Sequence, residues 1–174
     1  MSIRIITLLS LFTLLFLPKA HAQQMTVKVI AKTIEKQFEW EVSDQVKVEG
    51  EKAKINIRGW DEPTVKVVLK QVSKAPEKVV AERELSYQRY ILEKRKGVIY
   101  LKNYFAIPKN VKSIESIQKS EFEIWVPRKI KLQVTNNYGN TTLEMMAGDV
   151  NLNTKYGNVQ LNNYSGNASV KSYF

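Results

Sequence analysis

The chain has 174 residues, of which 27 are Lys or Arg and 17 are Asp or Glu, so its formal net charge is +10. It contains no cysteine, which excludes disulfides and cysteine nucleophiles, and its one histidine is His21. Because His21 lies in a predicted leader, the mature chain is expected to lack catalytic triads, histidine bases and the usual zinc sites. We therefore expect no catalytic residues, metal or cofactor.

Residues 1–22 have the layout of a secretory signal peptide. Arg4 gives a positive start, the run Ile5–Leu17 is apolar, and Ala20 and Ala22 form an A-x-A end. The apolar run is 13 residues long, whereas a membrane-spanning helix needs about 20. The sequence predicts cleavage after Ala22, no transmembrane segment in the mature chain, and export to the periplasm, the outer membrane surface or the extracellular space.

The charge is unevenly distributed along the mature chain. Without Arg4 and Lys19, 25 basic and 17 acidic residues remain, a net charge of +8. The excess lies in residues 23–131, with 23 basic and 15 acidic residues, whereas residues 132–174 carry two of each. This asymmetry predicts an N-terminal capping region and a separate C-terminal tract. A basic exported surface suits anionic headgroups or polysaccharide, or is simply a solvated face. Nucleic-acid binding is not expected.

The first part of the capping region alternates between apolar and polar residues. This period of two is typical of antiparallel strands with one face in the core. A turn is predicted at Gly59–Pro63, where Gly, Asp and Pro follow each other. The residues predicted to face inward are Val27, Val29, Phe38, Trp40, Val42, Val46, Val48, Ile55, Ile57, Val65 and Val67.

The rest of the capping region predicts one helix and further strands. Pro76 followed by Glu77 suits the first turn of a helix over residues 76–88. A hairpin is predicted over residues 90–101, with a charged tip, and a loop over residues 106–113. Residues 120–126, SEFEIWV, predict a strand with Phe122, Ile124 and Val126 on one face.

The C-terminal tract carries a repeat of glycines, each followed by Asn or Asp. The glycines are nine residues apart and are Gly139, Gly148, Gly157 and Gly166. At a period of 18, Asn136–Asn140 aligns with Thr154–Asn158. We interpret each glycine as a corner where the chain needs unusual dihedral angles, followed by a short strand. The tract therefore predicts a β-solenoid-like ladder of 18-residue (2 × 9) repeats, with a β-meander as the alternative.

Side chains at equivalent positions of such a ladder would stack along its edge. The predicted contact ladder consists of Tyr138, Tyr156, Asn140 and Asn158. A calcium-binding roll is not expected, because the tract offers only Glu144 and Asp149 as carboxylates. Since solenoids need about three repeats, we expect the natural chain to continue beyond Phe174.

The leader, the turn IRGWDEPTVKV, the strand SEFEIWVP and the ladder NYGN, AGD, KYGN, YSGN together resemble the adhesin-like β-strand-repeat family of exported bacterial proteins. The resemblance covers most of the mature chain. It implies a β-stack in the cell envelope, often encoded near genes of anti-sigma factors and envelope stress. The family has no known catalytic residues to carry over.

Three functions remain open from the sequence. The first is a non-catalytic envelope protein that presents a repetitive β-face to an envelope protein or glycan, or to a second copy of itself. The second is a periplasmic scaffold or regulator of envelope sensing. The third is a β-helix enzyme acting on glycans, for which Glu144 and Asp149 are the available carboxylates.

Overall fold

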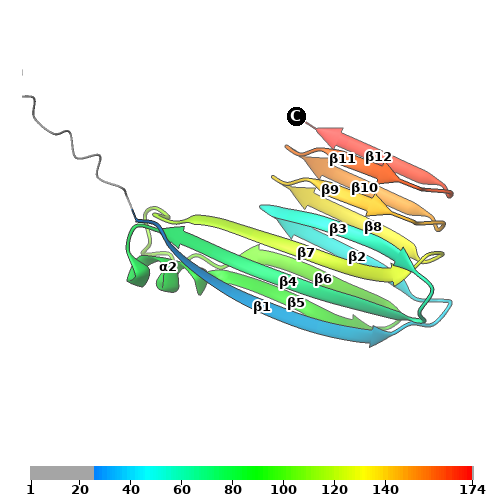
Figure 1. Ribbon diagram of the computed structural model, residues 1–174, viewed down its shortest axis with the longest axis horizontal. Coiled ribbons are helices and arrows are strands. Elements are labelled where there is room, and N and C mark those ends of the chain that lie inside the picture. The colour runs from blue at the N-terminus through cyan, green and yellow to red at the C-terminus, as the bar shows by residue number, and fades with distance from the viewer. Residues whose placement is uncertain (1–25, 174) are drawn as a thin grey trace, which may run out of the picture.

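The computed structural model describes residues 26–173, and the predicted signal peptide lies outside them. These residues form a mainly β fold with one short helix and two mixed sheets, which confirms the predicted class at this level (Figure 1). Within residues 26–173, no helix has the length and apolar character needed to cross a membrane. The elements are β1 (Lys28–Glu39), β2 (Gln45–Glu51), β3 (Ala53–Trp60), β4 (Thr64–Ala75), α2 (Lys78–Leu85), β5 (Gln88–Arg95), β6 (Val98–Phe105), β7 (Ile117–Pro127), β8 (Lys131–Asn137), β9 (Thr141–Glu144), β10 (Val150–Lys155), β11 (Val159–Asn162) and β12 (Ala168–Tyr173).

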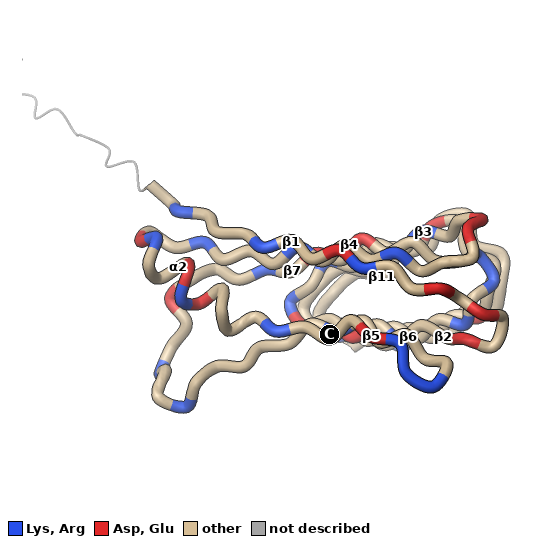
Figure 2. Tube along the Cα trace, turned by 90° about the horizontal axis from the view of Figure 1, so that it is seen from below, with Lys and Arg blue, Asp and Glu red and all other residues tan. Residues whose placement is uncertain are grey.

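The strands form two facing layers (Figure 2). Sheet A has the order β1-β4-β7-β3-β9-β11, and sheet B has the order β12-β10-β8-β2-β6-β5. Pairing is antiparallel at β1-β4-β7 and at the hairpin β5-β6, as predicted for that hairpin. All other pairs are parallel, so the predicted antiparallel pairing of the N-terminal strands is wrong for β2 and β3. The predicted helix over 76–88 is present but shorter, as α2.

From β8 onward the chain alternates between the sheets and returns above itself. Val150 pairs with Leu132 on one side and with Ala168 on the other, and Val159 pairs with Thr141. Each partner is 18 residues away in the sequence. This parallel pairing contradicts the β-meander alternative, which requires antiparallel neighbours. We define a coil as one passage of the chain through a strand of sheet B, a corner, a strand of sheet A and a second corner.

The stack of coils begins before residue 132. β2 pairs in parallel with β8, and β3 pairs in parallel with β9. The strands β2 and β3 therefore form the first coil in chain order. The chain then continues through β4, α2, β5, β6 and β7, which extend the sheets on the other side of β2 and β3, and β8 returns next to β2. The boundary predicted at residue 132 remains a prediction, and both sheets run across it without a break.

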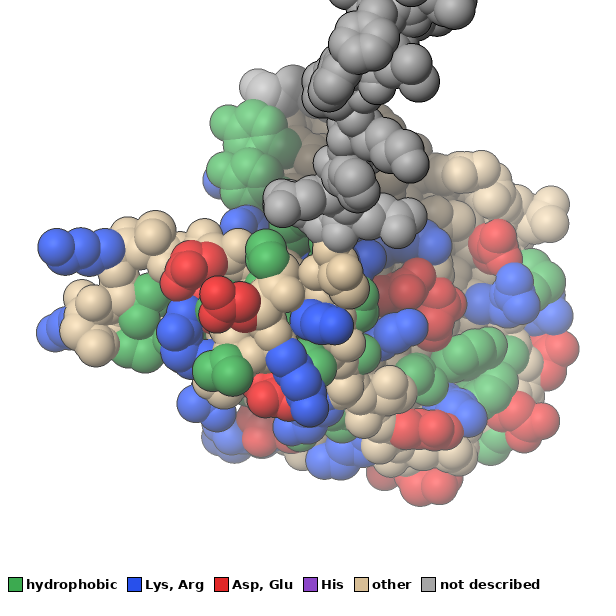
Figure 3. Space-filling model, turned by 60° about the vertical axis from the view of Figure 1, so that its left-hand side comes forward, with side chains coloured by type: hydrophobic (Ala, Val, Ile, Leu, Met, Phe, Trp, Pro, Cys, Tyr) green, Lys and Arg blue, Asp and Glu red, His purple; other side chains and the backbone are tan. Residues whose placement is uncertain are grey.

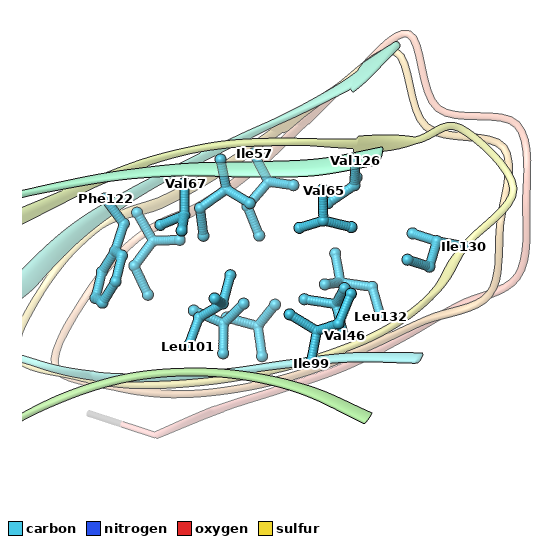
Figure 4. Packing of buried hydrophobic residues seen from close by; sticks show 14 of the residues in the cluster. Val46, Ile57, Val65, Val67, Ile99, Leu101, Phe122, Val126, Ile130 and Leu132 are labelled. Carbon is cyan, nitrogen blue, oxygen red and sulfur yellow. The ribbon is translucent and has the colours of Figure 1, made fainter. Parts of the chain in front are cut away.

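The core lies between the two sheets. In Figure 4, Ile57, Val67 and Phe122 of sheet A point toward Ile99 and Leu101 of sheet B. Each fully buried side chain of this size contributes about 1.5–3 kcal/mol to folding. The period of two thus correctly identified the inward positions of β2, β3, β4 and β7.

Three predicted inward residues are in fact exposed. Val27 and Val29 are 51% and 55% exposed, because Val27 precedes the edge strand β1 and Val29 lies on its outer side. Val42 is 88% exposed, because the chain turns between β1 and β2. In that turn the carboxylate of Asp44 accepts a hydrogen bond from the backbone N–H of Glu41 at 2.7 Å. The predicted alternation of apolar and polar residues therefore does not continue through Val42, because the chain turns there.

The two ends of the stack differ. At the end formed by β1 and β5, lysine side chains bridge the sheets: Lys36 Nζ donates to the carbonyl of Leu92 at 2.8 Å, and Lys94 Nζ donates to the carbonyl of Glu39 at 3.1 Å. Charged lysines on edge strands discourage further strand pairing. At the other end, all residues of β12 are exposed, including Val170 at 45%.

Candidate functional site

The four repeat glycines lie where the backbones of successive coils approach closely. A Cβ atom on Gly139 would overlap the backbone carbonyl of Ala53, and one on Gly157 would overlap that of Gly139. At the opposite corners, Gly148 and Gly166 meet the backbone carbonyls of Ile130 and Gly148 in the same way. The glycines are therefore needed because a side chain would separate the coils.

This finding corrects the predicted reason for the glycines. Among the glycines within residues 26–173, a positive φ occurs at Gly97 alone. The left-handed conformation falls instead on the residue before Gly139 and Gly157, with φ of 60° at Tyr138 and 55° at Tyr156. At the opposite corners it falls on Met145 and Asn163, three residues before Gly148 and Gly166. Lys52, with φ of 50°, occupies the same position in the first coil. We call Lys52, Tyr138 and Tyr156 the tyrosine corner.

The tyrosine corner is continuous along the stack. The backbone N–H of Lys52 donates to the carbonyl of Asn137, and that of Tyr138 donates to the carbonyl of Lys155, each at 2.8 Å. A bulky side chain in the left-handed region costs about 1–3 kcal/mol. Glycine or asparagine would avoid most of that cost. The tyrosines at this corner are thus not the residues that the backbone conformation prefers.

The predicted ladder residues come together in space. The rings of Tyr138 and Tyr156 stack with 4.9 Å between centroids and an interplanar angle of 11°. They are 55% and 56% exposed, so more than half of each side chain faces solvent. Next to them, the backbone N–H of Asn158 donates to Oδ1 of Asn140 at 3.1 Å. The proximity is observed, and a contact role for these residues stays a prediction.

A groove of about 520 Å³ adjoins the tyrosine corner. Its floor is the end of the outer face of sheet B, and its wall is the loop of residues 106–116, which projects beyond that sheet in Figure 2. We call it the loop groove. Its lining includes Glu49, Lys52, Tyr104, Ile107, Ile114 and Asn137. Sequence analysis missed this groove, because its lining comes from four segments that are distant in the sequence.

Two of the charged groups of the loop groove, Glu49 and Lys102, are paired with each other, and Lys52 Nζ lies 5.7 Å from the centroid of the Phe105 ring. Lys102 Nζ lies 2.7 Å from Glu49 Oε2, and Asn137 Nδ2 donates to Glu51 Oε2 at 3.2 Å. The hydrogen bond from Lys102, aided by Lys47, holds the pKa of Glu49 below its ordinary value against the effect of burial. Figure 3 shows basic and acidic side chains intermixed on the face it displays, with small apolar patches between them.

The loop wall is held in place by Glu84 of α2, whose side chain is fully buried. Its carboxylate accepts hydrogen bonds from the backbone N–H groups of Glu115, at 3.1 Å, and of Ser116, at 2.8 Å. Arg83 also contacts both Glu84 and Glu115. Burial alone would raise the pKa of Glu84, but these hydrogen bonds outweigh it and the pKa is lowered. This buried carboxylate could not be identified from the sequence, because the charged residues of α2, KVVAEREL, are typical of a helix on the surface.

The two carboxylates of the ladder make separate contacts. Glu144 Oε2 accepts a hydrogen bond from Arg58 at 2.8 Å, and Asp149 Oδ1 accepts one from Asn167 at 3.1 Å. Within the part of the chain that the structure describes, no group of three or more His, Cys, Asp or Glu is arranged to hold a metal ion.

No protein-family model matches the chain, and no curated protein matches it by sequence. Several solved structures are distantly similar. A proposed cell adhesion protein from Clostridium sporogenes is 12% identical with a TM-score of 0.38, over 83% of this chain and 99% of that one. A proposed lipid-binding protein from Parabacteroides distasonis is 16% identical with a TM-score of 0.38, over 83% of this chain and 59% of that one. A proposed adhesin from the same organism is 15% identical with a TM-score of 0.32, over 84% of this chain and 66% of that one. Because this likeness is distant, the function proposed for this chain is drawn from its own residues.

Proposed function

We propose that this chain is a non-catalytic, exported protein of the cell envelope that binds an envelope protein or glycan through the tyrosine corner. The observation that carries the proposal is the pair of stacked, half-exposed tyrosines in left-handed conformations. Residues held in costly conformations cluster at functional sites, because selection keeps them for a role other than folding.

The energetics support a role beyond stability. Stacking of the two rings contributes about 0.5–1.5 kcal/mol. Two left-handed tyrosines cost about 1–3 kcal/mol each. The corner therefore gains little or no net stability from Tyr138 and Tyr156. What the rings provide is a planar apolar surface with two hydroxyl groups at its edge, which is the composition that binding surfaces favour.

We further propose that the coils form a short β-solenoid. The 18-residue offset of the pairs Val150–Leu132, Val150–Ala168 and Val159–Thr141 supports it. In this architecture each coil buries its apolar face against its neighbours, so the same residue of every coil lies in one row. A row of side chains at strand spacing, about 4.8 Å, suits a partner that is itself extended or repetitive.

The proposal is tested with the mature chain and isolated envelope fractions of the producing cell. Wild type is expected to sediment with one fraction, and the double variant Tyr138→Ser, Tyr156→Ser is expected to lose at least about 90% of that binding. Serine keeps a hydroxyl group and removes the rings. Tyr90→Ser is the control, because Tyr90 is 37% exposed on β5 at the other end of the stack. Equal binding by wild type and the double variant would refute the proposal.

A further inference from the structure

The geometry points to the loop groove as a binding site for a neutral oligosaccharide. This inference rests on the proposed function and names the chemical class of its partner. The groove volume of about 520 Å³ lies within the range of about 300–1,000 Å³ that is typical of small-molecule sites. Lys52 and Asn137 line the groove, and Asn137 directly precedes Tyr138, so the groove and the tyrosine corner form one continuous surface.

The groove offers both kinds of surface that a sugar ring needs. Its apolar side chains are accessible: Tyr104, Ile107 and Ile114 are 37%, 47% and 36% exposed. These can pack against the C–H face of a pyranose ring. Hydroxyl and amide groups of Thr135 and Asn137 lie on the floor, where they can exchange hydrogen bonds with sugar hydroxyls.

The charges of the lining favour a neutral ligand. The lining contains two acids and two bases, and Lys102 is engaged by Glu49 at 2.7 Å. An anionic ligand would have to compete with Glu49 for the ammonium group of Lys102, and its attraction to Lys52 would be offset by Glu51. A fully apolar ligand, such as an acyl chain, would bury the polar floor without hydrogen bonds, which costs about 1–3 kcal/mol per group. A polyhydroxylated neutral chain incurs neither penalty.

The wall of the groove is preorganised. The buried carboxylate of Glu84 fixes the loop of residues 106–116 through the backbone N–H groups of Glu115 and Ser116. A wall that is already ordered does not have to be ordered when the ligand binds, so less free energy is lost on binding. Ile114 directly precedes Glu115, so these hydrogen bonds also hold Ile114 at a fixed position along the groove.

The test uses the mature chain and a panel of neutral oligosaccharides of three to six units built from glucose, N-acetylglucosamine or mannose. Oligogalacturonate of matched length is the acidic counterpart, and binding is measured by isothermal titration calorimetry. We expect at least one neutral series to bind, and Tyr104→Ala to weaken it at least about tenfold. Tyr90→Ala is the matched control, because Tyr90 and Tyr104 are both 37% exposed, and its affinity should equal that of wild type.

A second variant keeps the test decisive if Tyr104→Ala fails to fold. Ile107→Asp lies in the loop, outside the sheets, and should also weaken binding at least about tenfold while the thermal midpoint is unchanged. The inference is overturned if no neutral series binds, if oligogalacturonate binds equally well, or if both variants bind as wild type does. If envelope binding still depends on Tyr138 and Tyr156 in that case, the proposed function stands and only the assignment of the groove fails.

Discussion

Replacing Gly139 separates the two explanations for the repeat glycines. A Cβ atom at this position meets the carbonyl oxygen, the carbonyl carbon and the nitrogen of Ala53, all of them backbone atoms that cannot rotate away. The coils must therefore move apart, which would strain the hydrogen bond from the N–H of Ile55 to the carbonyl of Asn140 at 2.9 Å. Overpacking costs about 1–3 kcal/mol, and we expect about 3 kcal/mol for Gly139→Ala, since no side chain can absorb the shift.

Gly97 provides the contrast. Its φ is +72°, and a Cβ atom there would meet only Asp44 Oδ1, at 3.5 Å. Gly97→Ala should cost about 1–2 kcal/mol from the left-handed backbone alone, and Gly97→Asn should cost less, because asparagine tolerates that region. At Gly139, asparagine should be at least as destabilising as alanine.

The assay is equilibrium urea unfolding of the mature chain, with free energies compared for Gly139→Ala, Gly139→Asn, Gly97→Ala and Gly97→Asn. Circular dichroism of each variant before unfolding verifies that the sheets are intact. The steric explanation is wrong if Gly139→Asn is clearly milder than Gly139→Ala, since only a dihedral requirement rewards asparagine.

Three further predictions concern the tyrosine stack, the buried amide and the buried carboxylate. A double-mutant cycle of Tyr138→Ala and Tyr156→Ala should give a coupling energy of about 0.5–1.5 kcal/mol in urea unfolding, and zero coupling would contradict the stack. Asn136 is fully buried and its Nδ2 donates to the carbonyls of Ala53 and Gly139 at 2.9 Å; Asn136→Ala should cost about 2–4 kcal/mol, because both acceptors lose a partner. The pKa of Glu84 is lowered in the folded chain, so its stabilisation is complete above the unfolded pKa of about 4.3 and is lost as the pH falls through the folded value. The stability difference between wild type and Glu84→Gln should therefore shrink on acidification; a difference that is constant from pH 7 to pH 3 would refute this assignment.

The sequence predicted those features that depend on local pattern. The period of two identified the inward faces of β2, β3, β4 and β7, and the hairpin near residues 90–101 followed from one charged tip between two apolar runs. The spacing of Tyr138 and Tyr156 placed them at equivalent positions, and their rings are in contact. In each case the information lies within about 20 residues of chain.

The features that sequence analysis missed depend on contacts between distant segments. Gly139 is required by the backbone of Ala53, which lies 86 positions earlier, so no turn rule could reveal the reason. The first coil, β2 and β3, was hidden because the excursion from β4 to β7 separates it from β8. The loop groove and the role of Glu84 depend likewise on that excursion, which brings Ser116 back to α2.

The constant pairing offset of 18 residues between β8, β10 and β12 makes the length of this protein adjustable in steps. Insertion of one 18-residue unit between β10 and β12 would shift β12 by one strand spacing, about 4.8 Å, and would leave each of its side chains on its original face. Insertion of nine residues would instead exchange the two sheets. Duplication or loss of whole units thus provides a simple evolutionary route by which such a chain can vary its reach without altering how it folds.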